Sequence, residues 1–132
     1  MILIDTNVFV AYYNEQDTTH KRAVSLLKEI FLHKYGTPIT TDYVFDEAVT
    51  VTLRRTKNKD CAIALGNSIL TSEIRLLRIH EGMFQEAWNL FQTQKISFTD
   101  CTLVAAMRAL NIAYLATFDE TLQKVKGVIP VC

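Results

Sequence analysis

The sequence has little of several residue types that mark special classes of protein. Only 4 of its 132 residues are glycine and 2 are proline, while 49% are hydrophobic, which excludes an extended disordered chain. Its cysteines, Cys61, Cys101 and Cys132, are odd in number and lack metal-ligand spacing, which predicts free thiols in a reducing compartment. Because the apolar start is broken at Asp5 and has no basic leader, we expect a cytoplasmic protein without a signal peptide or membrane span.

The chain also has no net charge. The 14 Lys and Arg residues balance 14 Asp and Glu residues, so no broad basic surface is predicted and any binding of nucleic acid must be local. The length fits one compact domain of about 100 to 150 residues. We therefore expect a single domain over residues 1–132.

Short apolar runs alternate with segments of helical period. Residues 1–4 are apolar and end abruptly at Asp5, as expected of a strand buried on both faces. Similar runs follow at 38–40, 74–79, 113–117 and 128–131. Helical spacing lies between them, for example at Val24, Leu27 and Phe31. The alternation predicts an α/β fold of three layers, with a parallel sheet covered by helices on both faces.

Polar residues and glycine mark the expected ends of helices. Residues 58–60 and 97–99 are interpreted as breaks between successive helices, and Gly36 as the end of a long helix. Pro38 can only open its strand, because proline donates no hydrogen bond to a neighbouring strand.

Two of the predicted strands are followed by acids. Asp5 comes directly after the first strand, and Asp119 follows the apolar run 113–116, with Thr117 and Phe118 between them. Parallel α/β sheets bind ligands at the carboxyl ends of their strands, which favours a functional role for both acids. Each could instead cap the helix that follows it.

A third acid, Asp100, lies near the start of a predicted helix. With a period of 3.6 residues it shares a face with Leu103 and Met107, which should point inward. The alternative is a capping box, in which Ser97 caps the helix and Asp100 reaches back to it. The segment 41–55 adds Asp46 and Glu47, between which periodicity cannot choose, and either could be a solvated acid on a helix flank.

Acids from these segments could meet at one edge of the sheet. Several ionised carboxylates at close range raise one another's pKa or recruit a cation, and hard oxygen ligands suit Mg²⁺ or Mn²⁺. A divalent ion held in this way can acidify water and neutralise charge on a phosphate. The acids therefore point to phosphoryl or phosphodiester chemistry.

The pattern resembles the PIN-domain family, the nuclease fold of VapC-type toxins. Four segments carry the resemblance, which spans nearly the whole chain: residues 2–7, 41–50, 97–101 and 115–119. The resemblance implies a five-stranded parallel sheet in the order 3-2-1-4-5. It also selects Glu47 over Asp46 and Asp119 over Glu120.

The same resemblance implies a function. We expect an Mg²⁺- or Mn²⁺-dependent endoribonuclease, the toxin of a type II toxin-antitoxin module, which forms a homodimer, binds a cognate antitoxin and leaves a 5′-phosphate and a 3′-hydroxyl on cleaved RNA. The implied catalytic and metal-binding residues are Asp5, Glu47, Asp100 and Asp119. Thr6, Asn7 and Thr117 are implied as auxiliary residues that orient water or phosphate oxygens.

Two other functions compete with this one. An aspartyl-phosphate phosphatase would need a proton donor two residues after Asp5, where the chain has Asn7, whose amide cannot act as that acid. A catalytically silent module that only binds RNA or a partner would have no need of four acids.

The remaining polar and aromatic residues receive structural interpretations. The basic group Arg54, Arg55, Lys57 and Lys59 could steer RNA but is better explained as a solvated helix end. His20, His33 and His80 are scattered over different elements, which gives no support to a histidine base or a zinc site. Most of the aromatic residues at helical spacing are interpreted as core or dimer packing, namely Tyr12, Tyr13, Phe31, Phe84, Trp88 and Phe91.

Overall fold

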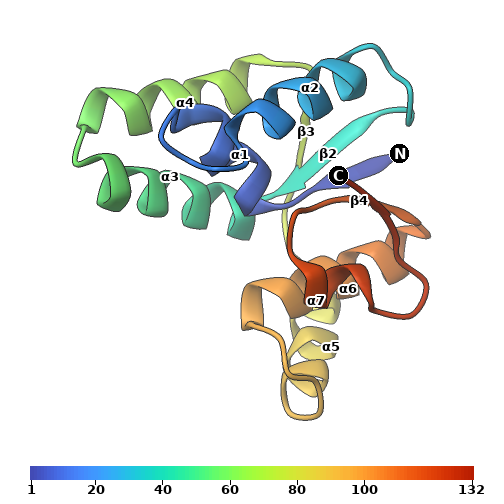
Figure 1. Cartoon of the computed structure of the whole chain (residues 1–132). Helices are drawn as coiled ribbons and strands as arrows, with labels where there is room; N and C mark the ends of the chain where they lie inside the picture. The colour runs from blue at the N-terminus through green and yellow to red at the C-terminus, as the bar shows by residue number, and fades with distance from the viewer.

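The computed structural model describes all residues from 1 to 132, and its strands and helices follow the order that the sequence predicts (Figure 1). The strands are β1 (Ile2–Ile4), β2 (Pro38–Thr41), β3 (Arg75–Leu77), β4 (Tyr114–Ala116) and β5 (Ile129–Val131). The helices are α1 (Thr6–Tyr13), α2 (His20–Phe31), α3 (Asp42–Thr56), α4 (Lys59–Thr71), α5 (Glu81–Phe91), α6 (Phe98–Leu110) and α7 (Glu120–Gln123).

All five strands are parallel and lie in the order β3-β2-β1-β4-β5, which confirms the order that the resemblance implied. Strand β1 is central and fully buried, because it pairs with β2 on one side and with β4 on the other. Ile4 lies opposite Ala116, so that Asp5 and Thr117 follow the two strands at the same carboxyl edge. The backbone N–H of Asp5 donates to the carbonyl oxygen of Ala116 at 3.0 Å.

Helices cover both faces of the sheet. In Figure 1, α1 to α4 lie together on one side of the strands, and α5 to α7 lie on the other. Helix α1 packs against α2, α3 and α4, while α5 packs against α6. The prediction of an α/β sandwich is therefore confirmed. None of these helices has the length and hydropathy that a membrane span requires.

Side-chain caps explain where the helices near the site begin. Thr41 Oγ1 accepts from the Val44 N–H at 3.1 Å and starts α3, directly after β2. The predicted breaks are confirmed, because Asn58 caps α4 and Ser97 caps α6 in the same way. Pro38 opens β2 as expected.

Gly36 does not end a long helix, and that prediction was wrong. Helix α2 ends earlier, at Phe31, and His33 then takes a left-handed conformation with φ of 59°. Gly36 instead belongs to the turn into β2, with φ of 84°. A Cβ atom there would come within 2.9 Å of the Met1 nitrogen, so glycine is needed both for its conformation and for the close approach.

The aromatic residues of α5 are not in the core, which corrects part of the prediction. Phe84, Trp88 and Phe91 are 41%, 48% and 42% exposed, because Met83 and Ala87 occupy the inner face of this helix. All three rings pack around Phe98 at the start of α6, with centroid distances of 5.3, 6.3 and 6.1 Å. Their use in a dimer contact stays a prediction.

Candidate active site

Asp5 is the most deeply buried of the four predicted acids, at 3% exposure. Its Oδ1 atom accepts from the Thr6 N–H at 2.7 Å, so Asp5 caps α1 as the alternative interpretation proposed. Its Oδ2 atom accepts from the Thr117 hydroxyl at 2.8 Å. Asp5 therefore caps α1 and at the same time lies at the carboxyl edge of the sheet.

Thr117 joins the ends of β1 and β4. It is fully buried, and its Oγ1 atom, besides donating to Asp5, accepts from Asn7 Nδ2 at 3.3 Å and from the Asp119 N–H at 3.0 Å. Asn7 Oδ1 in turn accepts from the Phe118 N–H at 3.1 Å. Thr117 and Asn7, two of the expected auxiliary residues, thus hold the two acidic segments in a fixed relation.

Thr6, the third expected auxiliary residue, differs from the other two. Its side chain is 7% exposed, and its Oγ1 atom is buried without a hydrogen-bond partner. Buried hydroxyl groups normally have a partner. This hydroxyl therefore has an unused hydrogen-bonding capacity at the start of α1, although its oxygen is covered by neighbouring atoms.

Asp119 also combines capping with proximity to the other acids. Its Oδ1 atom accepts from the N–H groups of Thr121 and Leu122 at 2.8 and 3.1 Å, which starts α7. Gln123 Nε2 donates to the carbonyl oxygen of Thr117 at 3.1 Å and secures this turn. Asp119 remains partly exposed.

Asp100 lies near the start of α6, where the predicted capping contact with Ser97 is present. Its N–H donates to Ser97 Oγ at 3.1 Å. Burial raises the pKa of Asp100 to about 6, together with the charges of Asp119 and Glu47, while hydrogen bonding to Ser97 opposes the rise. Asp100 is thus both a cap partner and a member of the acid cluster.

Burial raises the pKa of Asp5 to about 7, the larger of the two shifts. The charges of Asp100 and Glu47 raise it further, whereas the hydrogen bonds from Thr117 and Thr6 lower it. The charges of Asp100 and Glu47 therefore repel that of Asp5. The charges of Glu47 and Asp119 repel that of Asp100. These four residues are the acid cluster.

Burial separates the two candidate acids of α3. Val44, Ala48 and Thr52 form the buried face of this helix. Glu47 is half-buried and its charge acts on Asp5 and Asp100, while Asp46 is exposed and contributes to neither pKa shift. The structure therefore brings Glu47, and not Asp46, to the other acids.

No basic side chain compensates the acid cluster. The ion pairs of the chain lie elsewhere, and none includes a member of the cluster. The available donors are hard carboxylate oxygens in negative excess, which fits Mg²⁺ or Mn²⁺ in donor type and in charge. No group of three or more His, Cys, Asp or Glu side chains is close enough to form a complete ligand set by itself.

The three histidines lie at three separate places. His20 Nδ1 lies 2.8 Å from the carbonyl oxygen of Ala11, His33 pairs with Glu73, and His80 caps α5. The cysteines are free thiols.

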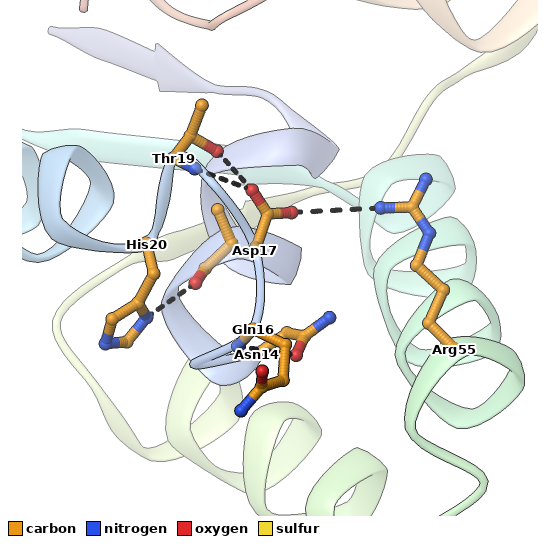
Figure 2. A network of polar contacts seen from close by, with 7 residues as sticks. Asn14, Gln16, Asp17, Thr19, His20 and Arg55 are labelled. Carbon is orange, nitrogen blue, oxygen red and sulfur yellow. Dashed lines mark hydrogen bonds and ion pairs between the residues drawn. The ribbon is translucent and has the colours of Figure 1, made fainter.

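The expected basic group at the end of α3 contains one residue with a structural role. Figure 2 shows Arg55 reaching from α3 toward Asp17 in the loop between α1 and α2, with 3.9 Å between Nη1 and Oδ2. Asp17 also accepts from the Thr19 N–H and hydroxyl at 2.8 and 2.6 Å. Partial burial raises the pKa of Asp17, but the Thr19 hydrogen bonds and Arg55 outweigh it, so the pKa is lowered.

Arg22 was not found by sequence reasoning. Its guanidinium carbon lies 4.7 Å from the centroid of the Phe118 ring, one residue before Asp119. Only the fold brings α2 to this segment, so the sequence contains no signal for this contact.

Comparison with solved structures shows similar folds in toxins. *Mycobacterium tuberculosis* VapC20, described as a sarcin-ricin loop cleaving toxin, is 24% identical, with a TM-score of 0.82 over 93% of each chain. FitAcB from *Neisseria gonorrhoeae* is 19% identical, with a TM-score of 0.70 over 98% of this chain and 96% of its own. VapBC2 from *Rickettsia felis*, bound to a promoter DNA fragment, is 18% identical, with a TM-score of 0.70 over 99% and 98%.

At these identities the similarity shows a shared fold. No curated sequence gives a significant match to the chain. The sequence profile described as the PIN domain, however, matches residues 2–128. With the strand order and the acids at the sheet edge, this match shows that the chain belongs to the PIN domain family.

Proposed function

We propose that this protein is an Mg²⁺- or Mn²⁺-dependent endoribonuclease that hydrolyses RNA phosphodiester bonds. The observation that carries the proposal is the convergence of Asp5, Glu47, Asp100 and Asp119 without a basic partner. A buried set of like charges is costly unless a cation is bound to it. Membership of the PIN family supports the proposal, because a cluster of acids that binds a divalent ion is what a nuclease of this fold would use.

The four acids would hold one or two divalent ions, partly through water. Mg²⁺ usually keeps several waters and takes only one or two carboxylates directly, so a complete protein ligand set is not required. When bound, the ion would supply the positive charge that acidifies water and stabilises negative charge on the phosphate.

The polar neighbours of the acids would position them for this role. The Thr117 hydroxyl fixes one oxygen of Asp5, and Asn7 fixes Thr117, so the carboxylate has one orientation. The unpartnered hydroxyl of Thr6 is covered, so it would donate to a water molecule or a phosphate oxygen at the same edge once a small local movement uncovers it. Thr117, Asn7 and Thr6 would therefore orient the acids, water or phosphate, while the four acids hold the ion.

The biological part of the proposal is a toxin of a type II toxin-antitoxin module. Support comes from the solved structures of similar fold, which include a sarcin-ricin loop cleaving toxin and a toxin-antitoxin complex from Klebsiella pneumoniae. We expect a cognate antitoxin as a separate chain. A homodimer is also expected, for which the exposed rings of α5 around Phe98 offer an apolar contact surface.

Cleavage of a labelled structured RNA in Mn²⁺, with and without chelator, tests the proposal. The wild type should cut in Mn²⁺ and stop with chelator, and the products should carry 5′-phosphates. Asp100→Asn should fold and fail to cut, while Asp46→Asn on the exposed face of α3 is the matched control and should cut normally. If the protein binds the RNA but shows no chelator-sensitive cutting, the silent binding module would be favoured.

A further inference from the structure

A groove lined by basic side chains lies between the segment after α5 and α7. It has a volume of about 430 Å³, and four of its lining residues are Lys95, Arg108, Lys124 and Lys126. No acidic residue lines it. We call these four residues and the hollow between them the basic groove.

Two lining residues of the basic groove contact the acid cluster or adjoin a residue that contacts it. Thr121 lines the groove, and its N–H donates to Asp119 at 2.8 Å. Ile96 also lines it and directly precedes Ser97, the residue whose Oγ accepts from the Asp100 N–H. One end of the groove therefore lies at the first turns of α6 and α7, next to two of the proposed metal-binding residues.

The groove continues away from the cluster along α6. A second hollow of about 440 Å³ shares Val104, Arg108 and Lys126 with the first, and no acidic residue lines it either. It extends to Asn111 and to Gly127, beside the starts of β4 and β5. The two hollows are therefore neighbours that share one wall, and the second lies nearer the opposite edge of the sheet.

The charge of these two hollows differs from that of the chain as a whole. The net charge of the protein is zero, yet four of its 14 basic residues gather here. Arg108 pairs with Glu86 at 3.3 Å, while Lys95, Lys124 and Lys126 have no carboxylate within ion-pair distance. Three lysine charges are therefore available to an anionic ligand.

We propose that the basic groove binds the phosphate backbone of an RNA strand whose reacting phosphodiester lies at the acid cluster. This inference rests on the proposed nuclease function and extends it to substrate binding. Lysines contact phosphate as point charges, and no aromatic ring lines the first hollow for bases to stack on, so the contacts should be independent of sequence. RNA is favoured over an acidic peptide because one strand would occupy both the groove and the proposed site of phosphodiester cleavage.

Salt-dependent RNA binding tests the groove. The triple variant Lys95→Gln, Lys124→Gln and Lys126→Gln is compared with its parent by fluorescence anisotropy on a labelled single-stranded RNA. Both carry Asp100→Asn and are kept in Mg²⁺, so that the RNA stays intact. Each phosphate contact contributes about 0.7 to the slope of log affinity against log salt, so the slope should fall by about 2. At about 100 mM salt the affinity should fall at least about tenfold.

A control of equal charge change is available on the other side of the molecule. Lys28, Arg54 and Lys59 are exposed and lie on α2, α3 and α4, so their triple replacement by glutamine should leave the slope unchanged. An equal fall of the slope in both triple variants would mean unspecific charge attraction and would overturn the groove proposal. Circular dichroism confirms that each variant is folded.

The outcomes separate the groove from the nuclease function. If the wild type cuts RNA and the groove variant binds with an unchanged slope, the groove proposal fails alone. If binding depends on the three lysines but no chelator-sensitive cutting occurs, the nuclease proposal fails and the groove stands. Displacement of the RNA by polyglutamate at comparable concentration would identify an acidic-peptide site and overturn the RNA assignment.

Discussion

Two aspartates of this protein stand in similar local settings and have opposite electrostatic properties. Asp5 and Asp17 each accept one hydrogen bond from a backbone N–H and one from a threonine hydroxyl. The pKa of Asp5 is nevertheless raised to about 7, and that of Asp17 is lowered. The hydrogen bonds are alike, so burial and the sign of neighbouring charges decide the difference.

The neighbours of the two carboxylates explain their different roles. Asp17 faces Arg55, and Figure 2 shows it enclosed in a network that ties the α1–α2 loop to α3. Asp5 faces Asp100 and Glu47, with no cation nearby. The first arrangement stabilises the native chain, whereas the second leaves unfavourable charge that a bound cation would relieve.

The largest expected effect is on RNA cleavage, which should depend on Asp5 and not on Asp17. Asp5→Asn should lower the rate of RNA cleavage at least about a thousandfold, because the amide keeps the shape of the side chain and removes a charged ligand. Asp17→Asn should keep cleavage within about twofold and lower the free energy of unfolding by about 1 kcal/mol, because its hydrogen bonds lose their charge assistance. Turnover of labelled RNA and urea denaturation measure the two effects, and equal loss of activity in both variants would contradict the comparison.

Divalent metal should stabilise the acid cluster and leave the Asp17 network unaffected. An ion present at about a hundred times its Kd adds about 2.7 kcal/mol to the free energy of unfolding. We therefore expect Mn²⁺ and Mg²⁺ to raise the melting temperature of the wild type and of Asp17→Asn by several degrees, but not that of Asp5→Asn. Thermal scans with Ca²⁺-free buffer and added chelator give the baseline, and a melting temperature indifferent to millimolar metal would argue against the site.

Stability should depend on pH in opposite directions for the two groups. The folded-state pKa of Asp5, about 7, exceeds its ordinary value of 3.8, so the folded protein binds this proton more tightly. Without metal, Asp5 alone should therefore lower the free energy of unfolding by about 3 kcal/mol as the pH rises from about 4 to about 7, at about 1.4 kcal/mol per pKa unit. Asp17 contributes stability above pH 3.8 that is lost as the pH falls through its lowered folded pKa.

Denaturation curves between pH 3 and pH 8 in chelator measure this dependence. Asp5→Asn should make the decline between pH 4 and pH 7 shallower, because its amide does not titrate; the remaining decline belongs to Asp100, whose pKa is raised to about 6. A wild-type curve that rises over this interval would show that the cluster is not strained by its own charge.

The smallest expected effect concerns the ion pair in the Asp17 network. Arg55 is largely exposed and lies 3.9 Å from Asp17, so its charge is screened by solvent. Arg55→Gln should lower the free energy of unfolding by less than about 1 kcal/mol and leave RNA cleavage unchanged. Lys57→Gln, two residues further along at the C-cap of α3, removes the same charge without an ion pair and is the control for Arg55→Gln.

Much of the fold follows from local signals that the sequence contains. The apolar runs before Asp5 and before Phe118 predicted β1 and β4, and the polar residues at 58–60 and 97–99 predicted breaks between helices. These features depend on neighbours in the chain, which a sequence displays directly. The strand order depends on long-range pairing and came only from the resemblance to the PIN family.

The parts that escaped prediction depend on contacts between distant segments. Periodicity could not choose between Asp46 and Glu47, because both lie near the margin of the buried face of α3. The basic groove combines Lys95 with Lys124 and Lys126, which no spacing in the sequence relates. The turn at Gly36 was misjudged because a glycine after a helix can end it or can serve the next turn.

The central position of β1 has a consequence for biosynthesis. This strand is made first, but its partner β4 and the acid Asp119 are encoded more than a hundred residues later. An incomplete chain on the ribosome leaves one side of β1 unpaired and cannot bring Asp119 to Asp100. Under the proposed activity, a cell that translates this nuclease meets the hazard only once β4 and Asp119 have joined β1 and Asp100, which leaves an interval in which an inhibitor can already be present.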